Sequence, residues 1–446
     1  MKLKFPVLAF CMALTTAAFS QQVKFTEYDL PNGLHVILHQ DKSAPVVAVT
    51  VMYHVGSKDE DTARTGFAHF FEHLLFEGSD NIKRGEFMKL VSSNGGQNNA
   101  NTTQDRTFYY EVFPSNQLQL GLWLESERMM HPVINEIGVK TQNEVVKEEK
   151  RQRLDNQPYG KFTSSVFSDM FKDHPYRWAP IGSMAHLDAA RLDEFINFFK
   201  KYYIPNNAVL TIAGDIDIEQ TKELVKNYFG PIPKGEPVVR KKIEEKPLGR
   251  ELVDTVYDAN IQIPAVFAAY RIPGFKSEDA KALEMISSVL SGSGSSRLQK
   301  KLVDTKKTAL QVAALNYPLE DYGLYITLAL PNNNASLDEL LQDIDNEVAD
   351  MQKNLISENE YQKLQNQFEN SFINANTSML GVAQNLANGY TFYNNTNHIN
   401  EELVKIRAVT REKIREVAKK YLTKDNRVVL YYMPQAQEQK QDKRAF

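Results

Sequence analysis

The sequence is nearly devoid of cysteine: among 446 residues, only Cys11 carries a thiol. Cys11 lies in a stretch that we expect to be removed, so neither disulfides nor thiol catalysis would be available to the mature chain. Long apolar runs are missing as well, because beyond the N-terminus no run approaches the roughly 18 residues of a membrane span. The net charge of −4 is spread along the chain, which argues against binding to nucleic acid or to a membrane surface. We therefore expect a soluble globular protein of two or three domains.

The N-terminus has the three parts of a secretory signal peptide. Lys2 and Lys4 supply the positive charge, residues 5–14 form a short apolar segment, and Ala18 and Ser20 are small residues before a cleavage point. We predict that residues 1–20 are a signal peptide and that the mature protein is periplasmic or secreted.

The most informative segment is His69-Phe70-Phe71-Glu72-His73, inside a helix predicted from Thr65 to Gly78. Residues three and four apart share one face of a helix, so His69, Glu72 and His73 would lie together. Neutral imidazoles suit Zn²⁺ as ligands, and the glutamate could act as a general base on a water held by the metal. This H-x-x-E-H order is that of the inverzincin peptidases.

The alternative for this segment is a structural pair of hydrogen-bonded histidines. It is the less favourable interpretation, because three polar groups in a helix rich in phenylalanine cost several kcal/mol when nothing satisfies them. A bound metal would satisfy them.

Proline and glycine accumulate between residues 231 and 250, which we expect to be an interdomain linker. After this linker, a predicted strand at Ala265–Tyr270, a polar loop and a predicted helix at Glu278–Leu290 repeat the order found around the motif. When Gly292 is aligned with Gly78, the positions of His69, Glu72 and His73 fall on Leu283, Ile286 and Ser287, respectively. The second half therefore looks like a duplicate without the metal chemistry.

The signal peptide, the linker and this duplication together divide the chain into five predicted segments. They are a signal peptide (1–20), an N-terminal zinc-bearing catalytic domain (21–230), the linker (231–250), a homologous C-terminal domain without metal ligands (251–435) and a polar tail (436–446).

A catalytic zinc site needs a third protein ligand. A charged helix predicted at Asn135–Leu154 offers Glu144, Glu148 and Glu149. From this helix alone, the three glutamates could equally form a solvated face.

The combination of segments resembles the pitrilysin (insulinase-type) metallopeptidases, in particular their short processing-peptidase-like branch. The resemblance covers about Val23 to Tyr432. The similar stretches are His69–His73, Val145–Glu149, Asn99-Ala100 with Thr107–Tyr110, His174–Tyr176 with Ile181–Ser183, and Tyr203–Ala208 with Gly214-Asp215.

The resemblance implies an α+β fold with two homologous sheet-plus-helices domains in one chain, forming half of a clam shell around a chamber. It also implies that a glutamate about 75 residues beyond the second histidine completes the zinc site, which selects Glu149, with Glu148 as the fallback. Relatives often carry another glutamate seven residues before this ligand. Here Gln142 occupies that position, and an amide can support a ligand by hydrogen bonding but brings no charge.

Asn99 and Ala100 are expected to bind substrate. By resemblance, they precede a strand that pairs with an extended peptide, and main-chain pairing gives affinity with little sequence demand. The alternative for Asn99 is a turn residue after Gly95-Gly96.

These features predict a zinc-dependent endopeptidase with one Zn²⁺ per chain, held by His69, His73 and Glu149, with Glu72 as the general base. The alternative is a catalytically silent structural or partner subunit, as some relatives are. A zinc-storing protein has no feature in its favour.

The resemblance also suggests that this chain works with a partner. In relatives, the half without zinc supplies an Arg and a Tyr, seven residues apart, that reach the substrate. In this chain those positions fall on Val303 and Leu310, and Arg297 is no substitute because Asp304 follows it at that spacing. We therefore expect a heterodimer with a related subunit that supplies the Arg/Tyr pair.

Overall fold

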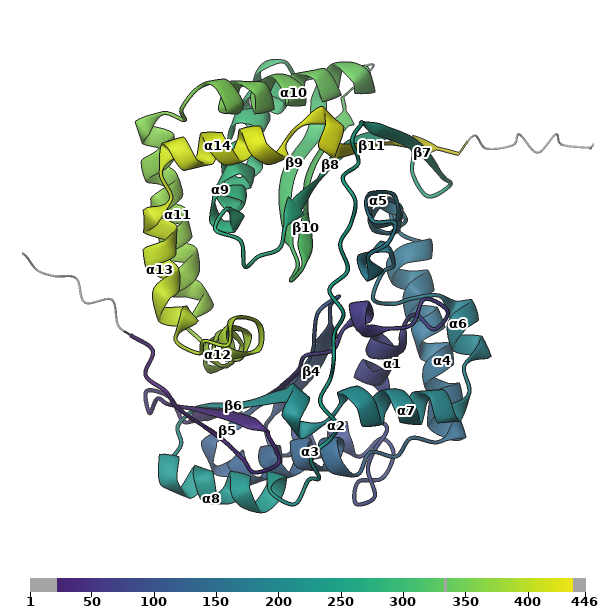
Figure 1. Ribbon diagram of the computed structural model, residues 1–446, viewed down its shortest axis with the longest axis vertical. Coiled ribbons are helices and arrows are strands. Elements are labelled where there is room, and N and C mark those ends of the chain that lie inside the picture. Colours follow the sequence, from purple (N-terminus) through teal and green to yellow (C-terminus); the bar gives the residue numbers. More distant parts are fainter. Residues whose placement is uncertain (1–21, 333–334, 436–446) are drawn as a thin grey trace, which may run out of the picture.

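The computed structural model describes residues 22–332 and 335–435. The predicted signal peptide and the polar tail after residue 435 lie outside these described residues. Two sheets, each with its own helices, lie one above the other and are joined by an extended segment along one side (Figure 1). No helix or strand occurs in this segment between residues 231 and 250. The predicted α+β fold with two sheet-plus-helices units is confirmed.

The first sheet is built around a central strand that is buried on both faces. The strand order of this sheet is β1 (Thr26–Asp29), β2 (His35–Gln40), β6 (Ala208–Gly214), β3 (Val46–Tyr53), β5 (Thr107–Pro114) and β4 (Gln97–Thr102). β2 and β6 run parallel, and the other neighbours are antiparallel. Because β3 is almost continuously apolar, it suits a position with helices on both faces of the sheet.

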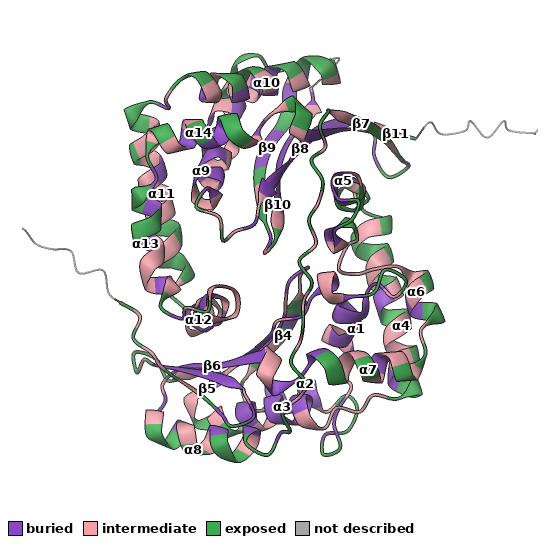
Figure 2. Cartoon of the chain, in the orientation of Figure 1, coloured by how far each residue is buried: buried purple, intermediate pink, exposed green. Residues whose placement is uncertain are grey.

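Most helices of the first half share one core on one face of this sheet. They are α1 (Phe67–Leu74), α2 (Phe87–Ser93), α3 (Leu118–Met130), α4 (Glu136–Lys150), α6 (Met184–Ala189), α7 (Leu192–Tyr202) and α8 (Ile218–Phe229). The inner strands of both sheets are mostly buried, whereas the helices expose their outer faces (Figure 2).

The second sheet repeats the first sheet but has no counterpart of β1. Its order is β7 (Leu252–Asp258), β11 (Arg427–Pro434), β8 (Ala265–Pro273), β10 (Tyr322–Pro331) and β9 (Ala309–Pro318). β7 and β11 are parallel and the other pairs antiparallel, so the pattern matches β2-β6-β3-β5-β4. Its helices are α9 (Ala280–Ser291), α10 (Leu337–Lys353), α11 (Glu358–Ala375), α13 (His398–Ala408) and α14 (Arg411–Tyr421).

Helix α9 follows β8 in the second half as α1 follows β3 in the first. Leu283 and Ile286, the counterparts of His69 and Glu72, are fully buried in the apolar core. Ser287, the counterpart of His73, is half-buried, so none of the three positions on α9 carries a histidine or a carboxylate.

Each half covers the second face of the other half's sheet with a helix. Helix α12 (Met379–Tyr393), from the second half, packs on β6 and β3 of the first sheet, where Leu386 meets Met52. Helix α5 (Phe162–Met170), from the first half, packs on β11, β7 and β8, where Phe167 meets Leu430 (Figure 1). The two halves therefore exchange helices and bury apolar surface in both directions.

The helix of the H-x-x-E-H motif is shorter than predicted, because the chain turns sharply on both sides of it. Gly66 caps it with a φ of +98°, and a Cβ there would lie 2.8 Å from the carbonyl oxygen of Ile181. The buried carboxylate of Glu60 accepts hydrogen bonds from the N–H groups of Gly66 and Ala68, at 2.8 and 2.9 Å. Glu60 thus satisfies free donors at the start of α1.

Candidate metal centre

Helix α1 has an aromatic face and a polar face. Phe67, Phe70 and Phe71 are buried, and their rings pack against Phe195 and Phe198 of α7. Because the helix repeats every 3.6 residues, the two histidines and Glu72 of the motif lie together on its other side.

Helix α4 brings Glu149 to this polar face. One carboxylate oxygen, Oε2, lies 3.4 Å from His69 Nε2 and 3.1 Å from His73 Nε2. All three candidate ligand atoms lie within 4.8 Å of one another, and no other group of this kind occurs in residues 22–332 and 335–435. Ligands at about 2.0–2.1 Å in a tetrahedral zinc site are about 3.3 Å apart. The two distances from Glu149 to the histidines are close to this separation, so the cluster could hold Zn²⁺.

Buried polar atoms without partners also fit a metal at this position. In the described chain, His69 Nδ1 and Glu149 Oε2 are buried and make no hydrogen bond. Burial lowers the pKa of His69 to about 4, and the neighbouring His73 adds to this effect, so the imidazole is neutral. Contact with His73 also holds the pKa of Glu149 below its ordinary value. A neutral imidazole and a carboxylate are the protonation states that zinc requires.

Glu148, the fallback third ligand, faces solvent instead. Its side chain is 53% exposed and pairs with Arg151 at 3.0 Å, in the wider helical turn (Arg151–Asp155) that continues α4. The structure thus places Glu149, and not Glu148, beside the two histidines.

Glu72 lies next to the candidate ligands and is oriented by strand β4. The hydroxyl of Thr102, the last residue of β4, donates to Glu72 Oε2 at 2.6 Å. Burial raises the pKa of Glu72 above its ordinary value. No local pattern marked Thr102 in the sequence, because its contact depends on how β4 pairs with β5.

Asn99 and Ala100 precede β5 (Thr107–Pro114) as expected, but they already lie within a strand of their own, β4, so Asn99 is not the turn residue of the alternative. β4 is the outer strand of the first sheet and pairs only with β5 among the described strands. The N–H of Ala100 donates to the side chain of Asn99 at 2.9 Å. This N–H is therefore not used in the ladder with β5.

Gln142 does not hydrogen-bond to any of the three candidate ligands. Its amide donates to Glu77 Oε1 at 2.5 Å, and Glu77 also pairs with Arg84. Since α1 and α4 run in opposite directions, residue 142 lies more than one turn away from Glu149, near the end of α1. Gln142 therefore ties α4 to the segment after α1.

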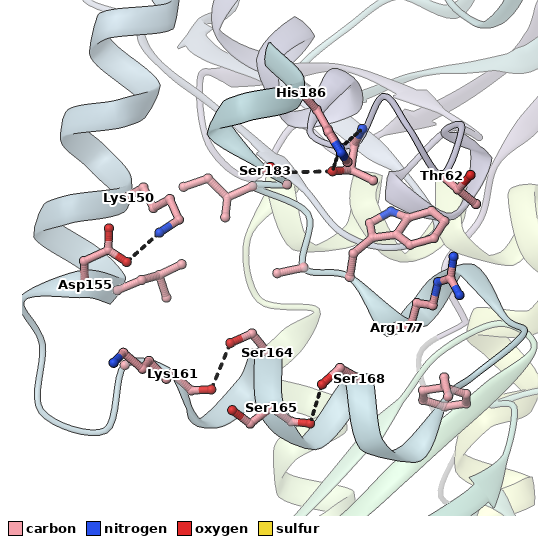
Figure 3. Close-up of a pocket in the computed structure, with 18 of the residues that line it drawn as sticks. Thr62, Lys150, Asp155, Lys161, Ser164, Ser165, Ser168, Arg177, Ser183 and His186 are labelled. Carbon is pink, nitrogen blue, oxygen red and sulfur yellow. Dashed lines mark hydrogen bonds and ion pairs between the residues drawn. The ribbon is translucent and has the colours of Figure 1, made fainter. Parts of the chain in front are cut away.

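A pocket of about 710 Å³ lies near the start of α1, between the end of α4, α5 and the segment before α6 (Figure 3). Lys150 forms an ion pair with Asp155 at 2.5 Å, and the hydroxyl of Thr65 lies 2.9 Å from His186 Nδ1. None of the candidate metal ligands lines this pocket. It is a separate cavity, and within its lining Lys150 and Asp155 neutralise each other.

None of the helices in the described chain has both the length and the apolar character needed to cross a membrane. The fold and the cluster together define a two-domain α+β protein with an H-x-x-E-H helix and a distant glutamate.

Comparison with known proteins agrees with this class. Residues 35–180 match the model of the insulinase family (peptidase family M16), and residues 189–368 match the M16 inactive domain. A zinc protease of Helicobacter pylori, PqqE, is 32% identical over 84% of this chain and 86% of its own length. This chain therefore belongs to the insulinase family, peptidase family M16, as its motifs predicted.

Solved structures show the same fold. The crystal structure of a protease from Helicobacter pylori superposes with a TM-score of 0.87 at 29% identity, covering 92% of this chain and all of the other. The periplasmic protease PqqL of Escherichia coli superposes with a TM-score of 0.77 at 19% identity, covering 94% of this chain but 48% of PqqL. One copy of this chain thus corresponds to about half of that longer protein.

Proposed function

We propose that this chain is a zinc-dependent endopeptidase that is periplasmic or secreted and binds one Zn²⁺ through His69, His73 and Glu149. The observation that carries the proposal is that the ligand atoms of these three side chains lie within 4.8 Å of one another, beside Glu72. Family membership and relatives named as zinc proteases support the same chemistry.

Zinc, when bound, would polarise the scissile carbonyl and make water nucleophilic at neutral pH. Glu72 takes the proton of the attacking water and delivers it to the leaving amine. The hydroxyl of Thr102 holds the Glu72 carboxylate at 2.6 Å, so the base is oriented before substrate arrives. The raised pKa of Glu72 suits this exchange, because a stronger base accepts the proton more readily.

The substrate is an extended peptide that adds a strand to the free edge of β4. The N–H of Ala100 is available for this pairing once it leaves the side-chain oxygen of Asn99. Pairing at the edge of a sheet reads the peptide backbone, so it tolerates many sequences. Thr102, which ends the same strand, hydrogen-bonds to Glu72, so a peptide paired along β4 would run toward the general base.

The full active site forms with a related subunit that supplies an Arg/Tyr pair. Val303, at the expected Arg position, and Leu310, at the Tyr position in β9, cannot stabilise a developing oxyanion. The relation to PqqL supports such pairing, because this chain matches about half of that protein. A silent role for the whole chain is less favoured, since its first half keeps the general base and all three candidate ligands.

Hydrolysis of a mixed peptide library by the purified mature chain, with and without chelator, tests the proposal. We expect cleavage that chelator abolishes and added Zn²⁺ restores. Cleavage that is insensitive to chelator, or a chain that retains no zinc, would refute it.

A further inference from the structure

Helix α1 is too short to fix its own orientation. It has eight residues, fewer than an isolated helix needs for stability in water. Its phenylalanine rings pack against α7, but apolar packing has little directionality, and the hydrogen bonds of Glu60 hold only its first turn. Something directional must set the rotation of α1 about its axis, because metal ligands need to be held within about 0.5 Å.

Two buried tyrosine hydroxyls provide directional contacts with α1. Tyr109 Oη, from β5, donates to the carbonyl oxygen of Phe71 at 2.8 Å, and Tyr203 Oη, from the segment after α7, donates to that of Ala68 at 3.2 Å. Both side chains are almost fully buried. Burial raises the pKa of both phenols far above the ordinary value, so they remain protonated donors.

The two carbonyl groups are three residues apart, and each belongs to a residue just before one of the motif's polar residues. Phe71 directly precedes Glu72, and Ala68 directly precedes His69. The Phe71 carbonyl also accepts the helical N–H of Leu75 at 3.1 Å, so the tyrosine adds a second donor to a carbonyl that is already satisfied. These bonds are not needed to form the helix, which suggests that they determine how it is rotated.

We propose that Tyr109 and Tyr203 are positioning residues that set the rotation of α1 and so aim His69, Glu72 and His73 at one point. The consequence for zinc binding rests on the function proposed above, but the restraint on α1 is a property of the metal-free chain. Neither tyrosine touches the metal position; each acts through the backbone of α1.

Tyr53 provides a matched control. Its ring lies 6.0 Å from that of Tyr109 and 5.0 Å from that of Tyr203, between ring centroids, and it is fully buried. Its hydroxyl has no hydrogen-bond partner among the described residues. Tyr53→Phe therefore removes the same atom from the same aromatic cluster without removing a bond to α1.

The first measurement is hydrogen exchange of the α1 amides in the metal-free full chain. Tyr109→Phe and Tyr203→Phe should each speed exchange of these amides about fivefold, the effect of one lost hydrogen bond, with little change in the central strands. Tyr53→Phe should leave α1 unchanged. If α1 exchanges alike in all three variants, or if exchange rises equally throughout the first sheet, the inference is overturned.

The second measurement is zinc affinity by chelator competition, with the visible spectrum of Co²⁺-substituted protein as a report on ligand geometry. We expect affinity to fall roughly tenfold in each single variant and up to about 100-fold in the double variant, with an altered Co²⁺ spectrum. Wild-type affinity and spectrum in the double variant would overturn the positioning role. If the wild type itself binds no zinc while α1 still loosens in the two variants, the proposed function fails and the restraint on α1 stands.

Discussion

Glu72 lies between the two candidate histidine ligands but outside the ligand cluster, so its role can be separated from metal binding. Glu72→Gln keeps the size of the side chain and can still accept the hydrogen bond from Thr102. We expect the variant to retain zinc and its melting temperature but to cleave peptides 10²–10⁴-fold more slowly, the usual loss for a general base. Near-normal turnover in a zinc-loaded variant would exclude this role.

Glu148 and Glu149 are adjacent glutamates in one helix, and only Glu149 approaches the histidines. Glu149→Gln should therefore weaken zinc retention, measured by metal analysis after dialysis, whereas Glu148→Gln should not. The opposite result would move the third ligand to Glu148.

At the scale of elements, the edge of β4 is where substrate would pair. Proline is tolerated in an edge strand where its missing N–H faces outward. Because the N–H of Ala100 bonds only to the neighbouring Asn99 side chain, Ala100→Pro should spare the sheet but remove a donor to the peptide. We expect a raised KM at unchanged zinc content, measured by steady-state kinetics. An unchanged KM would place the substrate elsewhere.

Elements defined by local pattern could be predicted from the sequence. The apolar run of β3, the β1–β2 hairpin and the histidine spacing of α1 all follow from neighbouring residues. Strand β4 could not be predicted, because its polar sequence is extended only through pairing with β5. Similarly, α5 and α12 bury their apolar residues against the sheet of the other half, so the local sequence could not predict which sheet each helix covers.

At the candidate metal centre, the two histidines and Glu72 could be predicted from their helical spacing in the sequence. Glu149 came from family resemblance, because charge patterning in α4 could not separate it from a solvated face. Thr102 and the two tyrosines could not be predicted from the sequence, because they contact α1 from strands and loops distant in sequence.

At the scale of the whole molecule, one lysine connects the two halves. Lys58 Nζ, in the first half, lies 2.9 Å from Asp105 and 2.6 Å from Glu320 on the β9–β10 hairpin. Lys58→Met would leave the buried Asp105 without an ion-pair partner among the described residues and would remove one of the cations around Glu320, at a cost of about 3–5 kcal/mol in the free energy of unfolding. Lys276, 44% exposed and also paired with Glu320, is the control: Lys276→Met should cost at most about 1 kcal/mol. Equal losses in urea denaturation would contradict this ranking.

The same cluster gives stability a pH dependence. Burial opposes ionisation of Glu320, but His54 and Lys58 outweigh it and hold its pKa well below the ordinary 4.5. A carboxyl group with a depressed pKa contributes stability above its unfolded pKa and loses it as the pH falls. The free energy of unfolding should therefore decline below about pH 4.5, and more shallowly in Glu320→Gln. Parallel profiles for the two proteins would show that Glu320 contributes nothing.

Assembly is the remaining expectation at this scale. The chain alone should show low peptidase activity, and co-expression with a related subunit carrying the Arg/Tyr pair should raise it. Size-exclusion chromatography and peptide hydrolysis of both preparations would test this. Full activity from the chain alone would overturn the heterodimer.

The exchange of helices between the halves also affects how the chain folds while it is being synthesised. The last strand of the first sheet ends at Gly214, but α12, which covers that sheet, begins only at Met379. At synthesis rates of about 5–20 residues per second, these intervening residues take roughly 10–30 s to appear. During that interval Ile37, Met52 and Phe108 stay open to solvent and to other nascent chains. A molecular chaperone is thus most valuable to this protein before its second half has been made.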